Sequence, residues 1–184
     1  FLLDADSKVV SAAAFDRVPS PNASPDVYSE ARYPDGFDVL WVTDAPTPGA
    51  ANVVPRVTDI VINEIFYNPP EDRTGEFLEL YHRGADGVID ISGFRFDRGI
   101  DYTFPEGTSL APGEYLVLSE DPEVLREHYG LEGGHRYEGG LANGGENIRL
   151  VDGLGNLVDE VRYWDGGRWS LWADGRGASL ELID

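Results

Sequence analysis

The sequence lacks cysteine and methionine, and Lys8 is its single lysine. Without cysteine the chain can form neither disulfides nor thiolate metal sites, and its redox compartment stays undetermined. No apolar run approaches the roughly twenty residues that a membrane-spanning helix needs, so we expect no membrane span. The chain begins at Phe1 rather than at methionine, and we therefore expect it to be a processed piece of a longer protein.

Negative charge dominates the composition. The 184 residues include 34 aspartates and glutamates against 14 lysines and arginines, which gives a net charge of −20. Nucleic-acid surfaces depend on clustered cations, so this balance argues strongly against a nucleic-acid partner. Disordered acidic chains have few aromatic residues, whereas this sequence has 4 Trp, 9 Tyr and 8 Phe. The chain is therefore expected to bury a core.

Short segments with alternating polarity, separated by Gly, Pro and Asp, run along most of the chain. Asp59–Phe66 and Glu76–Tyr81 are two of them. The others are Glu114–Ser119, Asn147–Val151, Leu157–Tyr163 and Ala178–Ile183. Many short strands at such spacing predict an all-β sandwich or barrel. One short surface helix is predicted at Pro122–Tyr129, with Asp121 as its N-cap and Gly130 as its stop signal.

An internal repeat predicts two modules. Phe1–Phe15 matches Arg149–Tyr163, and each segment is predicted to form two strands joined by an Asp-rich turn. Residues 1–52 are therefore interpreted as the end of one module and residues 53–184 as the next, joined at a Pro/Gly linker. The second module then lacks its last strand. Either Phe37–Thr43 supplies that strand, by folding back or by exchange, or a sheet edge stays open.

A family resemblance rests on several short motifs that together span nearly the whole chain. They are Ile62–Ile65 with Tyr67–Pro69, Glu76–Tyr81, Asp90–Phe94, Phe104–Thr108, Leu110–Val117 and Pro46–Asn52. With them the chain resembles the lamin tail domain family, in the forms found in bacterial and archaeal secreted or surface proteins. The resemblance implies an immunoglobulin-like β-sandwich with a non-catalytic, accessory or tethering role. His82 departs from the family, which usually carries asparagine there.

Candidate catalytic groups are few. Glu64 and Glu79 could form a carboxylate pair, which does acid–base work when its environment separates the two pKa values. The two residues are expected on neighbouring strands, where a structural role is favoured. His82, His128 and His135 show no metal-binding spacing. We therefore predict that the chain is not an enzyme and has no cofactor, with calcium as the one alternative.

Calcium would bind at Asp-rich turns. The candidate ligands are Asp4, Asp6, Asp97, Asp101 and Asp152. Carboxylate oxygens in such loops suit calcium, but the full ligand ladder and a distal bidentate glutamate are missing. Turn geometry alone also favours Asp and Gly at these positions.

Three tryptophans in a Gly-rich stretch, Trp164, Trp169 and Trp172, are candidates for partner or sugar contacts. The alternative is that their rings close one end of the sandwich. Arg168 and Arg176 lie between and beside them, which permits cation–π packing.

The sequence thus predicts a non-catalytic interaction or tethering module of a larger secreted or cell-surface prokaryotic protein. It would bind protein partners or neighbouring modules, or itself, through a β-edge and end-loop contacts. The alternative is a calcium- or glycan-binding accessory domain of an extracellular hydrolase.

Overall fold

Strands form most of the secondary structure in the computed structural model of the chain. The described residues are 2–3, 6–7, 9–11, 29–37, 39–52, 59–70, 75–131 and 134–183. The chain divides into two units, Phe1–Pro55 and Arg56–Asp184. The origin of residues 1–52 and 53–184 as copies of one module stays a prediction.

The described residues of the first unit form two antiparallel pairs of strands. β1 (Leu2–Leu3) pairs with β2 (Val9–Ser11), and β3 (Ser29–Arg32) pairs with β4 (Leu40–Thr43). Three of the four residues of β4 are buried: Trp41, Val42 and Thr43. β4 lies within Phe37–Thr43, the segment predicted to supply the last strand of the second module. In the structure it pairs with β3 of the first unit.

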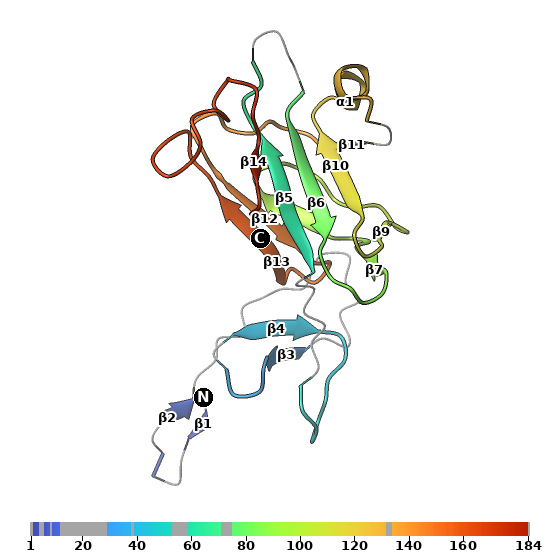
Figure 1. Cartoon of the computed structure of the whole chain (residues 1–184). Helices are drawn as coiled ribbons and strands as arrows, with labels where there is room; N and C mark the ends of the chain where they lie inside the picture. Colours follow the sequence, from blue (N-terminus) through green and yellow to red (C-terminus); the bar gives the residue numbers. More distant parts are fainter. Residues whose placement is uncertain are drawn as a thin grey trace. The chain divides into compact units, whose positions relative to one another are not determined.

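The described residues of the second unit form two main sheets and a short strand pair (Figure 1). The five-stranded sheet has the order β11-β10-β6-β5-β14. Its strands are β5 (Ile60–Phe66), β6 (Phe77–His82), β10 (Tyr115–Ser119), β11 (His135–Arg136) and β14 (Leu180–Glu181). The smaller sheet has the order β13-β12-β8, formed by β8 (Arg95–Arg98), β12 (Asn147–Val151) and β13 (Leu157–Arg162). β7 (Ile89–Asp90) pairs with β9 (Ser109–Leu110).

The core of the second unit draws on both main sheets, which confirms the predicted all-β sandwich. Alternation along each strand sends every second side chain inward. The fully buried residues of the core include Ile60, Leu78, Leu80, Leu118, Ile148, Leu150 and Tyr163. A bulge between Ile62 and Glu64 in β5 turns Glu64 onto the outer face of the five-stranded sheet.

Helix α1 (Pro122–Tyr129) has the predicted bounds and caps. The Asp121 carboxylate accepts a hydrogen bond from Glu123 N at 3.2 Å, and Gly130 adopts the left-handed conformation with φ 67°. Leu125 is the buried residue of the helix and packs on Phe66 and Phe77. The described residues contain no helix with the length and apolarity that a bilayer span requires.

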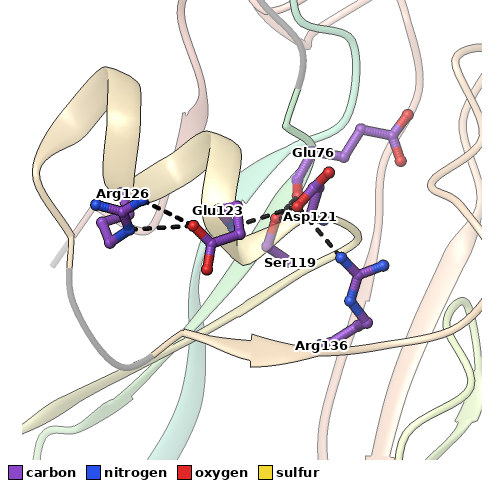
Figure 2. Close-up of polar contacts among 6 residues, drawn as sticks. All are labelled: Glu76, Ser119, Asp121, Glu123, Arg126 and Arg136. Atoms are coloured by element: carbon purple, nitrogen blue, oxygen red, sulfur yellow. Dashed lines mark hydrogen bonds and ion pairs between the residues drawn. The ribbon is translucent and has the colours of Figure 1, made fainter.

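Polar contacts around the start of α1 join the helix to its neighbouring strands (Figure 2). Asp121 forms an ion pair with Arg136 on β11 at 3.2 Å. Ser119 Oγ donates to Glu76 O at 2.8 Å and accepts from Asp121 N at 3.1 Å. Glu123 forms an ion pair with Arg126 within the helix at 2.8 Å. Figure 2 also shows this pair. These contacts hold β11 beside the last two residues of β10.

Candidate functional site

β10 is fully paired on one side only. On the β6 side, His82 N donates to Glu114 O at 3.0 Å. Because backbone groups alternate sides along an antiparallel strand, the N–H groups of Tyr115 and Val117 point away from β6. On that other side β11 pairs only with the last two residues of β10. That parallel register also places His135 N–H against Val117 O. Within the described part of the chain, the N–H and C=O of Tyr115 and the N–H of Val117 therefore form an open sheet edge.

A groove of about 700 Å³ lies along this open edge. One wall is Tyr115–Val117, and the opposite wall includes Gly107–Leu110, Leu131 and His135. Tyr115 is 55% exposed and stacks on Tyr81 with the ring centroids 4.6 Å apart. The groove is thus large enough to receive side chains, and it lies beside the backbone of Tyr115 and the N–H of Val117, which no described strand pairs.

Three glutamates form a row on the outer face of the five-stranded sheet. The strand register places Glu181 opposite Glu64, and Glu64 opposite Glu79. Next in the row is Val117 of β10, which lies opposite Glu79. Like charges placed directly opposite each other repel, so this row destabilises the sheet.

The environment of Glu64 opposes its charge. Burial raises the pKa of the Glu64 carboxyl, and the neighbouring Glu79 and Glu181 raise it further, while a hydrogen bond with Ser179 lowers it. Glu79 accepts a hydrogen bond from Asn63 Nδ2 at 2.8 Å. Among the described residues, no arginine, lysine or histidine forms an ion pair with these three glutamates. The two sequence-predicted carboxylates thus do lie together, in a partly buried acidic row.

Replacing Glu64 with glutamine is expected to raise the melting temperature at pH 7. The raised pKa means that the folded state binds a proton at Glu64 more readily than the unfolded state does. The contribution of Glu64 to stability is therefore lost as the pH rises from the ordinary value near 4.5 through the raised pKa. The gain from Glu64→Gln should accordingly shrink as the pH falls through this range, which melting curves between pH 3.5 and 8 would measure.

Glu106→Gln is the matched control, because Glu106 is an exposed glutamate in a turn and the change in net charge is the same. Equal gains from both variants at pH 7 would contradict a local origin and assign the effect to total charge.

The three histidines lie in separate places. His82 is fully buried with Nδ1 3.1 Å from Leu110 O, His135 lies beside the groove with Nδ1 2.7 Å from Tyr102 OH, and His128 is on α1. The described residues hold no group of three His, Cys, Asp or Glu side chains placed to bind a metal ion.

The calcium candidates are dispersed among turns and strands. Asp152 accepts hydrogen bonds from Leu154 N, Asn156 N and Asn156 Nδ2 at 2.8–2.9 Å, so its carboxylate organises its own turn. Asp97 forms an ion pair with Arg149 at 3.3 Å. Asp101 is exposed, and its backbone exchanges hydrogen bonds with that of Glu138. Asp6 lies in an exposed turn, and Asp4 is outside the described residues. Calcium binding stays a prediction.

The tryptophan candidates differ in their surroundings. Trp172 is 65% exposed and Trp164 41% exposed, whereas Trp169 packs against the core. The guanidinium groups of Arg162, Arg168 and Arg176 lie over the rings of Trp164, Trp169 and Trp172 at 4.6, 5.6 and 5.6 Å. Trp164 and Trp169 also line a depression of about 620 Å³. Two rings thus remain accessible for contacts, and a sugar or partner ligand there stays a prediction.

A buried polar cluster was not predicted from the sequence. Tyr163 OH lies 3.0 Å from Glu146 Oε1 and 2.9 Å from Ala142 O, and its ring packs on Tyr67 with the centroids 4.7 Å apart. Burial and the nearby Glu146 raise the pKa of Tyr163. Glu146 also accepts from Ala142 N at 2.7 Å, so the cluster fixes the loop before β12. The only part of this cluster with a sequence signal was Tyr163, at the end of the predicted strand Leu157–Tyr163.

The sandwich of two sheets with one short helix defines an immunoglobulin-like β-sandwich protein. The model of the Lamin Tail Domain family matches residues 54–165, which is more than half of the chain. The chain therefore belongs to the lamin tail domain family, whose non-enzymatic, immunoglobulin-like domains mediate protein interactions. Comparison with curated proteins and with solved structures gave no significant match.

Proposed function

We propose that the second unit is a non-catalytic interaction module that holds a partner protein by adding one of its extended segments to the β10 edge. The observation that carries this proposal is the open edge formed by the backbone of Tyr115 and the N–H of Val117, beside a groove of about 700 Å³. Strand addition uses main-chain hydrogen bonds for affinity and neighbouring pockets for specificity. Both elements are present here.

The length of the edge suits a specific partner better than aggregation. An exposed strand edge is a template for other chains, and proteins usually keep such edges short. β11 covers the last two residues of β10, and the Asp121–Arg136 ion pair supports that position. The groups left open are the N–H and C=O of Tyr115 and the N–H of Val117, which suit a short extended peptide.

We further propose that the parent protein is secreted or displayed on a prokaryotic cell surface, where the module tethers partners or neighbouring modules. The resemblance of its motifs to the prokaryotic forms of the family supports this placement. The net charge of −20 disfavours anionic partners such as nucleic acids, which supports a protein partner.

Val117→Pro is expected to weaken binding of extended peptides at least about fivefold, because proline removes the outward N–H donor without touching the bonds to β6. The probes are heptapeptides selected on the wild-type chain from a random displayed library, and fluorescence anisotropy measures their affinity. Ser109→Tyr is a second variant that fills the groove from the opposite wall.

Amide hydrogen exchange provides a readout that does not depend on the variants. Bound peptide should slow exchange at Tyr115 and Val117, whereas Leu116 and Leu118, which face β6, should already be slow in the free chain. Peptides that bind both variants as tightly as the wild type, without protecting these amides, would contradict the proposal. A dimer of the free chain that Val117→Pro abolishes would instead assign the edge to a second copy.

A further inference from the structure

We propose that the depression between Trp164 and Trp169 is a binding site for a neutral carbohydrate, with one sugar ring stacked on Trp164. The carboxylate of Asp165 and the guanidinium of Arg168 would bind the hydroxyl groups of that sugar. This inference goes beyond the proposed strand addition and does not depend on it, because it concerns the loop that follows β13.

The depression has the size and the lining of a small-ligand site. Its volume of about 620 Å³ lies within the range of about 300–1,000 Å³ that such sites occupy. Its lining consists of the consecutive residues Trp164–Trp169. A hydrogen bond from Trp169 N to Gly166 O at 3.4 Å closes the turn that separates Asp165 from Arg168. Gly166 and Gly167 carry no side chain, so a ligand can approach the backbone between the two charged residues.

Trp164 provides a flat apolar surface at this depression. The residue is 41% exposed. The guanidinium of Arg162 lies 4.6 Å from the centre of the Trp164 ring and covers one face of it. Arg162 is not among the residues that line the depression, so a sugar ring would stack on the face that Arg162 leaves uncovered. Trp169 packs against the core and forms part of the wall.

Two charged side chains in the lining have unused capacity for hydrogen bonds. Among the described residues, neither the Asp165 carboxylate nor the Arg168 guanidinium forms an ion pair or a hydrogen bond with another side chain. The Arg168 guanidinium lies 5.6 Å from the centre of the Trp169 ring, which favours its position at the wall. A carboxylate accepts hydrogen bonds and a guanidinium donates them, so the two groups can bind hydroxyls of one sugar.

The opposite charges of Asp165 and Arg168 favour a neutral ligand with several hydroxyl groups. An anion would be attracted by Arg168 but repelled by Asp165, and the net charge of −20 also opposes it. An apolar side chain of a protein partner would remove both charged groups from water without pairing them, which costs free energy. Sugar hydroxyls both donate and accept, so they can satisfy both groups while the C–H face of the ring packs on Trp164.

The test titrates the whole chain with four neutral pentasaccharides: cellopentaose, xylopentaose, mannopentaose and laminaripentaose. Pentagalacturonic acid is the anionic counterpart. We expect isothermal titration calorimetry to give a Kd of about 1 mM or lower for at least one neutral pentasaccharide. Because this ligand carries no charge, its affinity should change by less than about twofold between about 50 and about 300 mM salt. Pentagalacturonic acid should bind most weakly.

Variants of the chain locate the binding at the depression. Trp164→Ala should weaken it at least about tenfold, because the stacking surface is lost. Trp172→Ala is the matched control, because Trp172 is 65% exposed and lies under Arg176 but does not line the depression. Its affinity should stay within about twofold of the wild type. Asp165→Ala and Arg168→Ala change exposed residues, and each should weaken binding about threefold or more.

Melting curves verify that the variants are folded. No binding by any neutral pentasaccharide would overturn the proposal, and so would equal losses from Trp164→Ala and Trp172→Ala. Tighter binding of pentagalacturonic acid than of every neutral sugar would also overturn it and assign the depression to an anion. If Trp164→Ala abolished the binding of peptides while no sugar bound, the depression would belong to a protein partner. Val117→Pro should leave sugar binding unchanged, so the two proposals can fail separately.

Discussion

Gly145→Ala is expected to lower the free energy of unfolding of the second unit by at least about 2 kcal/mol. Gly145 has φ +101°, a conformation that side chains rarely adopt. A Cβ atom there would lie 2.5 Å from Tyr163 O and 2.7 Å from Trp164 Cα. These neighbours belong to the backbone, so no side-chain rotation can relieve the clash. Denaturant unfolding followed by tryptophan fluorescence measures the loss.

The neighbouring residue provides a matched control. A Cβ atom at Gly144 would meet nothing within 4 Å, and its φ lies outside the unfavourable range. Gly144→Ala should therefore change stability by less than about 0.5 kcal/mol. Similar effects of the two substitutions would contradict the close approach of the loop to the end of β13.

Leu80→Ala is expected to cost about 2–5 kcal/mol, the range for truncating a buried leucine. Leu80 is completely buried and lies on β6, the middle strand of the five-stranded sheet, between Ile62 and Leu116. The truncated side chain leaves a cavity because both neighbouring strands are held in register. The same unfolding measurement gives the value.

Leu171→Ala is the control for lost apolar surface, because Leu171 is 58% exposed. We expect a change of less than about 0.5 kcal/mol. A loss below about 1 kcal/mol for Leu80→Ala would show that this part of the sheet is not packed as the sandwich requires.

Elements with strong local signals were predicted well. Alternation predicted Asn147–Val151 with the bounds of β12, and the caps predicted Pro122–Tyr129 with those of α1. Alternation predicted a strand over Ala178–Ile183, whereas β14 in the structure is only Leu180–Glu181, which pairs with β5. The two-residue strands β7, β9 and β11 carry no alternation, so nothing local indicated them. Their pairing depends on contacts distant in sequence.

The candidate site could be predicted only in part. Glu64 and Glu79 were expected on neighbouring strands, and the register confirms that they lie opposite each other. The bulge at Asn63, which turns Glu64 outward, leaves no sequence signal. The open edge depends on where the pairing of β11 with β10 begins, and tertiary contacts such as the Asp121–Arg136 ion pair decide that position. No pattern within Glu114–Ser119 could have shown it.

The pairing of β14 with β5 has a mechanical consequence for the proposed tethering role. The two strands are antiparallel, so the chain enters β5 and leaves β14 at the same end of the pair. A pulling force applied at the start of β5 and the end of β14 would load the backbone hydrogen bonds between the two strands one after another. Among the described residues, few backbone contacts join the strands: the pairs Leu180 with Ile65 and Glu181 with Glu64, and a hydrogen bond from Leu182 N to Asn63 O at 2.8 Å. Under tension β14 would therefore detach first and extend the chain, while the remaining four strands of the sheet stay paired.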